Sequence, residues 1–133
     1  MTRVVVPVRY PLSAHSKRTF ERALSVAEER DADLTVLHVN LYQNGRQITR
    51  AELKRAVERE FGPVARARYV VRSGFLVEET ILDEIAAENA DIVVIGHRQA
   101  SRWKRLIGRL THDPDIETFL KERLECTVIT VGV

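Results

Sequence analysis

Hydrophobic residues along the chain gather in five short runs at fairly even spacing. The runs cover residues 3–8, 33–39, 67–71, 91–96 and 126–131, and each is rich in Val, Ile or Thr. The first, fourth and fifth runs are almost continuously apolar, as expected for strands that are covered on both faces. Arg66 and Arg68, at alternate positions, give the third run a polar face, which suits an edge strand. The pattern predicts a parallel sheet.

Four segments with helical periodicity lie between these strands. After Ser13, apolar residues recur at the three- and four-residue spacing of one buried helix face. Thr49 and Glu52 form a capping box that opens a second helix. A third helix is expected from about Leu76, and a fourth after the Asp113 N-cap and the proline that follows it.

Strict alternation of strands and helices indicates right-handed βαβ units and therefore a doubly wound α/β fold. We expect one domain over residues 1–133, a Rossmann-like three-layer sandwich whose five-stranded parallel sheet has the order 3-2-1-4-5. The longest irregular stretches are residues 40–48 and 97–112. Long loops inside compact domains are more often functional than accidental.

Composition narrows the class of protein. The chain has 133 residues, of which 44% are hydrophobic and 30% charged, and no apolar run is long enough to cross a bilayer. The N-terminal residues do not form a secretory signal, so we expect a cytoplasmic protein. The single cysteine, Cys126, excludes an internal disulfide and a cysteine-rich metal cluster.

The charges are segregated, although the formal net charge is only +2. Seventeen of the 21 basic residues are arginines, which favour forked contacts to carboxylate or phosphate. Residues 78–91 hold acids and no base. Residues 92–112 hold bases and no acid, namely Arg98, Arg102, Lys104, Arg105 and Arg109. The nearly neutral net charge therefore conceals a strong local field.

Candidate binding chemistry lies where the first and fourth strands end. In open α/β sheets the ligand crevice lies outside the carboxyl ends of the strands, at the point where the strand order reverses. The predicted order brings Arg9 to that point together with His97 and Arg98, close to Ser13 at the start of the first helix. This set suits an anion.

Four of the strand segments carry a resemblance to a known family. They are, in chain order, Val4-Val5-Val6-Pro7-Val8, Leu34-Thr35-Val36-Leu37-His38-Val39, Asp91-Ile92-Val93-Val94-Ile95-Gly96 and Cys126-Thr127-Val128-Ile129-Thr130-Val131. Together they resemble the universal stress protein family. The resemblance spans the whole chain. It implies an adenine-nucleotide-hydrolase-like sandwich, frequently dimeric through its last strand, in a family of which one branch binds ATP and another does not.

The ATP-binding pattern of that family is altered in this sequence. Arg9 stands where the ATP-binding branch has an aspartate, and Gln99 stands at the second glycine of its phosphate loop. Gly96 and Gly108 match the first and third glycines, the latter with one residue deleted, and Arg109 replaces a hydroxyl residue. These changes alter the shape of the pocket and the sign of its charge, so we expect weak or absent ATP binding. No cofactor is assigned; ATP or another nucleotide is the candidate.

The candidate residues for binding an anionic ligand share a position near this crevice or on the basic segment. They are Pro7, Arg9, Ser13, Val39, Gly96, His97, Arg98, Arg102, Gly108 and Arg109.

The basic segment 97–109 has two interpretations. Its cations around Trp103 could bind a nucleotide, an RNA backbone or a phosphorylated ligand, with the indole stacking on a base. Alternatively it is a solvated loop whose arginines pair with the acidic block 78–91 and whose Trp103 packs on the fold.

Other reactive residues give no catalytic set. His38 is expected to be structural, Cys126 is expected to be a small core hydrophobe, and no histidine spacing indicates a metal site. Three hypotheses follow: a stress-response protein that acts by binding, an RNA- or partner-binding module that uses the basic segment, and a hydrolase or transferase acting on a phosphorylated molecule. The third lacks a candidate base.

The final strand carries no charge and no proline. As a sheet edge it would expose unpaired backbone groups, so we expect a homodimer in which two such edges pair. The interface residues would be Thr127, Val128, Ile129, Thr130 and Val131.

Overall fold

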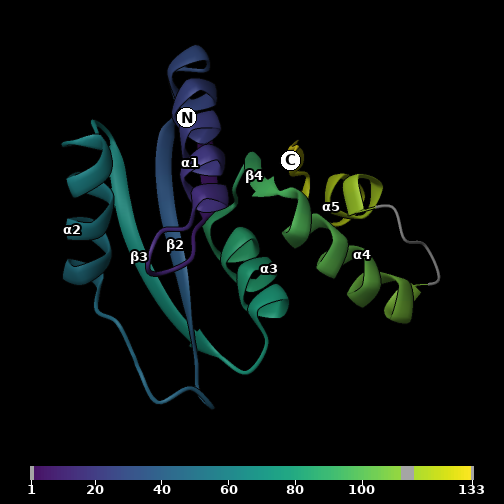
Figure 1. The fold of residues 1–133 in the computed structure, drawn as a ribbon. Coiled ribbons are helices and arrows are strands. Elements are labelled where there is room, and N and C mark those ends of the chain that lie inside the picture. Colours follow the sequence, from purple (N-terminus) through teal and green to yellow (C-terminus); the bar gives the residue numbers. More distant parts are fainter. Residues whose placement is uncertain (1, 112–115, 133) are drawn as a thin grey trace.

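The computed structural model describes residues 2–111 and 116–132, and for residues 107–111 and 116–119 it describes the backbone alone. Five strands alternate with helices along the chain (Figure 1). The strands are β1 (Arg3–Pro7), β2 (Asp33–Leu41), β3 (Ala67–Gly74), β4 (Ile92–Gly96) and β5 (Thr127–Val131). The helices are α1 (Ala14–Glu29), α2 (Arg50–Phe61), α3 (Val77–Glu88), α4 (His97–Thr111) and α5 (Ile116–Leu124).

All strand pairs are parallel, and the sheet order is β3-β2-β1-β4-β5. The predicted fold class and strand order are therefore confirmed. The strand β3 lies at one edge and β5 at the other. The first strand is central, so the carboxyl ends of β1 and β4 lie side by side at the point where the order reverses.

The side chains of the sheet alternate between two hydrophobic clusters, one on each face. Val4 and Val6 of β1 pack with Phe20 of α1 and Leu53 of α2. On the other face, Val5 of β1 belongs to a cluster that is formed with α3, α4 and α5. Helices therefore cover both faces, α1 and α2 on one and α3, α4 and α5 on the other (Figure 1).

The helix starts follow the sequence signals. Ser13 caps α1 and accepts a hydrogen bond from the backbone N–H of Ser16 at 3.1 Å. Thr49 and Glu52 form both hydrogen bonds of the capping box at the start of α2. These bonds satisfy backbone donors that a helix leaves free at its first turn.

The segment 97–111 is a helix, and the expectation of an irregular basic loop there was wrong. Ala100, Trp103 and Leu106 recur every three residues, which is the spacing of one buried helix face. Trp103 is fully buried, and its indole N–H donates to the backbone carbonyl of Glu78 at 3.0 Å. Lys104 and Arg105 lie at exposed positions of the same helix. His112, Asp113 and Pro114, including the predicted N-cap, lie outside the described residues.

Two glutamates of the acidic block, Glu84 and Glu88, are paired with arginines of the sheet. Arg72 Nε lies 2.7 Å from a carboxylate oxygen of Glu84. Glu88 contacts Arg68 at 2.6 Å and Arg3 at 3.3 Å. Both glutamates lie on α3, and Arg68 and Arg72 belong to β3. For Glu84 and Glu88, the interpretation in which the acidic block pairs with the arginines of the basic segment is therefore wrong.

The strand β5 pairs only with β4 among the described strands. Thr127 and Thr130 are exposed, whereas Val128 is buried in the core. No helix among the described residues is long and apolar enough to cross a membrane.

Candidate functional site

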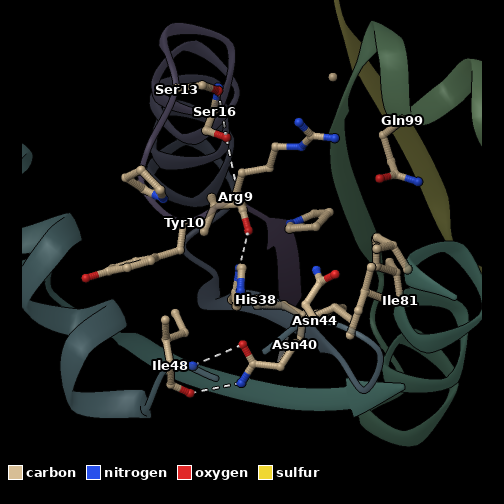
Figure 2. Close-up of a pocket in the computed structure, with 18 of the residues that line it drawn as sticks. Arg9, Tyr10, Ser13, Ser16, His38, Asn40, Asn44, Ile48, Ile81 and Gln99 are labelled. Carbon is tan, nitrogen blue, oxygen red and sulfur yellow. Dashed lines mark hydrogen bonds between the residues drawn. The ribbon is translucent and has the colours of Figure 1, made fainter. Parts of the chain in front are cut away.

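A cleft of about 890 Å³ lies at the carboxyl ends of the central strands (Figure 2). Its walls come from the ends of β1, β2 and β4, the first turns of α1 and α4, the segment after β2, and α3. A volume of this size accommodates a small-molecule ligand. The cleft therefore occupies the place at which doubly wound folds bind their ligands.

The first turn of α1 is joined to the end of β1 by a small hydroxyl network. The backbone N–H of Arg9 donates to Ser16 Oγ at 3.1 Å, and the hydroxyl oxygens of Ser13 and Ser16 lie 3.3 Å apart. Ser16 is buried, while the side chain of Arg9 is exposed. The network thus fixes the backbone from which the Arg9 side chain extends, next to a helix N-terminus that favours negative charge.

The β2 wall contains two sets of polar contacts, one partly buried and one buried. His38 Nδ1 donates to the carbonyl oxygen of Val8 at 3.0 Å, which leaves Nε2 of the neutral ring as an acceptor. Burial lowers the pKa of His38, although its hydrogen bonds to Val8 and Asn40 oppose the shift. Asn40 exchanges hydrogen bonds with the backbone of Ile48, at 2.9 and 3.2 Å, and so holds the segment after β2 against the sheet (Figure 2).

Four arginines line the cleft, namely Arg9, Arg46, Arg98 and Arg102. None of the described lining residues is Asp or Glu. The Arg46 guanidinium carbon lies 5.2 Å from the centre of the Tyr10 ring, a cation–π distance. Figure 2 shows the Arg9 guanidinium extending toward the side of the cleft where Gln99 lies. The cleft is therefore cationic, and its chemistry suits an anion.

The α4 wall presents Gln99 in the first turn of the helix. Its side-chain nitrogen is buried and has no hydrogen-bond partner. A buried donor without a partner costs free energy. Just before this turn, a Cβ atom at Gly96 would lie 3.3 Å from Thr19 Oγ1, so glycine lets α1 approach β4 closely at this wall of the cleft.

The structure brings together most of the candidate residues predicted from the sequence. The residues in the cleft wall are Pro7, Arg9, Ser13, Val39, Gly96, Arg98 and Arg102. His97 is exposed and is not among the residues that line the cleft. Gly108 and Arg109 lie on the α4 backbone, and their side chains are outside the described part of the chain.

The candidate binding residues chosen from the sequence did not include Tyr10, Arg46 or Gln99, which line the cleft, and His38 was treated as structural only. The signal for Arg46 was its place in an irregular stretch between a strand and a capping box. Gln99 could have been found from the helical spacing of residues 97–106. The position of Tyr10 beside His38, with ring centroids 6.3 Å apart, depends on tertiary structure.

Two sequence interpretations can now be settled. Trp103 is fully buried, so its indole is not available for stacking on a base, and the interpretation that it packs on the fold is confirmed. Cys126 is also fully buried, and burial raises the pKa of its thiol to about 11, as for a small core hydrophobe. Among the described side chains, no group of three His, Cys, Asp or Glu residues is arranged to hold a metal ion.

The fold and the cleft define the class: a doubly wound α/β protein with a cationic crevice where its strand order reverses. The family model of the universal stress proteins matches residues 1–113, and the chain belongs to the universal stress protein family. The predicted resemblance is therefore confirmed. No sequence among the curated proteins is similar enough to this chain to count as a match.

Solved structures of the same family share the fold. A universal stress protein in complex with cAMP is 18% identical, with a TM-score of 0.64, over 98% of this chain and 96% of that one. A universal stress protein from Lactobacillus plantarum is 19% identical, with a TM-score of 0.64, over 98% and 97%. One from Archaeoglobus fulgidus DSM 4304 is 23% identical, with a TM-score of 0.65, over 98% of this chain and 43% of that one.

Proposed function

We propose that this protein is a cytoplasmic stress-response protein that acts by binding a small phosphorylated ligand, a nucleotide being the favoured class. The ligand occupies the cleft at the ends of β1, β2 and β4. Arg9 contacts the phosphate, and Arg98 and Arg102 of α4 contribute positive charge from the opposite wall.

The observation that carries this proposal is the positive charge of the residues that line the cleft. Arg9, Arg46, Arg98 and Arg102 line it, and none of the described lining residues is acidic. Guanidinium groups bind phosphate through charge-assisted forked hydrogen bonds. The solved universal stress protein in complex with cAMP is a relative with a nucleotide ligand, which supports a nucleotide over other anions.

In this proposal Mg-ATP binds weakly. Arg9 places positive charge at the end of β1, and Gln99 places an amide side chain in the first turn of α4. Helix α4 begins directly after Gly96, so a flexible phosphate loop does not follow β4. We therefore expect Mg-ATP affinity to be weaker than micromolar.

Thermal-shift measurements test the proposal with a panel of AMP, ADP, ATP, cAMP, inorganic phosphate and a short RNA. A ligand that binds only the native state raises the melting temperature by an amount that grows with the ratio of ligand concentration to dissociation constant. A phosphorylated small molecule should stabilise the wild type and Arg55→Asp, and stabilise Arg9→Asp much less. Arg55 is an exposed residue of α2 outside the cleft wall, so its variant matches the change in charge.

The same ligand panel distinguishes binding of a small ligand in the cleft from the alternative, binding of RNA along α4. Lys104 and Arg105 are exposed and do not line the cleft, so they could contact an RNA backbone without it. Stabilisation by RNA alone, equal in the wild type and Arg9→Asp, would favour that alternative and contradict the proposed function.

We also propose a homodimer through β5. Its outer edge is unpaired among the described strands, and the strand holds no charge or proline to protect it. Pairing with a second copy about a two-fold axis would satisfy the free backbone groups of both chains.

A further inference from the structure

The cleft lacks the groups with which proteins hold Mg²⁺ beside a phosphorylated ligand. Mg²⁺ in such sites is bound by one or two carboxylates together with phosphate oxygens and water. None of the described residues that line this cleft is Asp or Glu. The described residues also contain no group of three His, Cys, Asp or Glu side chains that could hold a metal.

Arginine side chains supply the positive charge that a metal ion supplies in other phosphate-binding sites. Arg9 and Arg46 approach from the β1 and β2 walls, and Arg98 and Arg102 approach from α4. A phosphate that binds Mg²⁺ loses both net negative charge and free oxygen atoms. Each loss weakens its charge-assisted bonds to guanidinium groups.

Two further features lie beside the arginines, the amide of Gln99 and the N-terminus of α1. The side-chain nitrogen of Gln99 is a buried donor without a partner beside the α4 wall, and the amide oxygen of the same side chain lies on the side that faces Arg9 (Figure 2). The first turn of α1, where Ser13 and Ser16 lie, adds the positive end of a helix dipole. The charged groups of these walls and the α1 N-terminus thus favour a bare anion.

We propose that the cleft binds its phosphorylated ligand as the metal-free anion, and that Mg²⁺ competes with the arginines for this ligand. This inference rests on the proposed function. It predicts that binding responds to the level of free Mg²⁺ in the direction opposite to that of a site that binds the Mg-nucleotide complex.

Isothermal titration calorimetry with ADP tests the inference, in EDTA and in saturating MgCl₂ at equal ionic strength. Equal ionic strength is needed because salt screens all charge interactions. The dissociation constant of ADP should be about tenfold higher in MgCl₂, because the metal removes charge-assisted bonds. Binding of cAMP should not change, because its single phosphodiester charge binds Mg²⁺ poorly.

Two variants with the same change in charge sharpen the test. In Arg9→Asp, ADP should bind more weakly in EDTA, and the effect of Mg²⁺ should disappear or reverse because a carboxylate can hold the metal. Arg55→Asp should retain the wild-type ratio. Equal or tighter binding of ADP in MgCl₂ by the wild type would overturn this inference alone. Absence of binding by both ADP and cAMP would overturn the proposed function and this inference with it.

Discussion

The backbone N–H of Arg9 donates a hydrogen bond to the hydroxyl oxygen of Ser16 at 3.1 Å. The bond joins the residue after Val8, at the end of β1, to the first turn of α1, and thereby sets where the Arg9 side chain begins. Because Ser16 is only 8% exposed, water does not readily replace the hydroxyl. The position of the charged side chain thus depends on a buried neutral contact.

Replacing this hydroxyl tests that dependence. Ser16→Ala should lower the free energy of unfolding by about 1 kcal/mol, because a buried backbone donor loses its acceptor. It should also weaken binding of ADP, since Arg9 is held less firmly. Ser25→Ala is the matched control: Ser25 is an exposed residue of α1 whose hydroxyl donates to Glu21. Urea denaturation and calorimetry of both variants give the comparison, and equal behaviour would contradict this role of Ser16.

Glu84 and Glu88 are neighbouring carboxyl groups on the face of α3 that meets the sheet, and each affects the pKa of the other. Burial raises the pKa of Glu84, and the neighbouring Glu88 carboxylate raises it further, against the opposing effect of Arg72. Burial alone would raise the pKa of Glu88 as well, but bonds from Glu84, Thr35 and Arg68 outweigh burial and lower it. Glu88 Oε2 has no partner unless Glu84 holds a proton that it can donate.

Replacing each glutamate by the isosteric glutamine should therefore have different effects on the free energy of unfolding. Glu88→Gln should lower the free energy of unfolding by about 2 kcal/mol at neutral pH, because Arg3, Arg68 and Thr35 lose a carboxylate partner. Glu84→Gln should leave stability unchanged or raise it, because its amide can donate to Glu88 without a bound proton. Chemical denaturation of both variants measures this difference, and a larger loss in Glu84→Gln would contradict the shared proton.

The pH dependence of these variants has opposite signs. Because the pKa of Glu88 is lowered in the folded protein, ionised Glu88 stabilises the fold at pH values above the ordinary pKa of a glutamate. That contribution is lost as the pH falls through the folded-state pKa. The deficit of Glu88→Gln should thus shrink toward acid pH. The raised pKa of Glu84 stabilises the fold at low pH, and this contribution is lost as the pH rises through the folded-state pKa. Glu84→Gln should thus gain relative to the wild type as the pH rises.

Trp103 reports on the packing of α4. Trp103→Ala should lower the free energy of unfolding by about 3–5 kcal/mol, because it empties a buried site and removes the bond to Glu78. Arg105→Ala, in the same helix at an exposed position, should change stability by no more than about 0.5 kcal/mol. The indole is the chain's only tryptophan, so its fluorescence should shift to longer wavelength on unfolding. Native emission typical of a solvated indole would contradict the packing.

The β5 edge gives a prediction about assembly. Sedimentation of the wild type should show a dimer, and Thr130→Lys should shift it to monomer by placing like charges across the two-fold seam. Thr130 is exposed, so the variant should still fold. Ser25→Lys places the same charge on an exposed part of α1 and should remain dimeric. A monomeric wild type at tens of micromolar would contradict the proposed interface.

The sheet could be predicted because its signals are local. Continuous apolar runs indicated β1, β4 and β5, and the polar alternation around Arg68 indicated an edge strand, which the structure confirms as β3. Helix α4 was mistaken for a loop because the density of charge drew attention from Ala100, Trp103 and Leu106. The three-residue spacing of these apolar positions is the local signal for a helix.

The cleft could be predicted only at its two strand ends. The topology brings Arg9 and Arg98 together, and the strand order was readable from the sequence. The third wall depends on β2 continuing to Leu41 and on Asn40 binding the returning backbone at Ile48. That contact joins residues across a turn whose path no local pattern specifies, and it brings Arg46 into the site.

The most direct test of the account is a crystal structure of the protein grown with ADP in the absence of divalent metal. We predict that the phosphates lie in the cleft within hydrogen-bond distance of the Arg9 guanidinium, on the side where Gln99 lies, without a bound metal ion. Phosphates bound at Lys104 and Arg105 on the outer surface of α4, with the cleft empty, would contradict it.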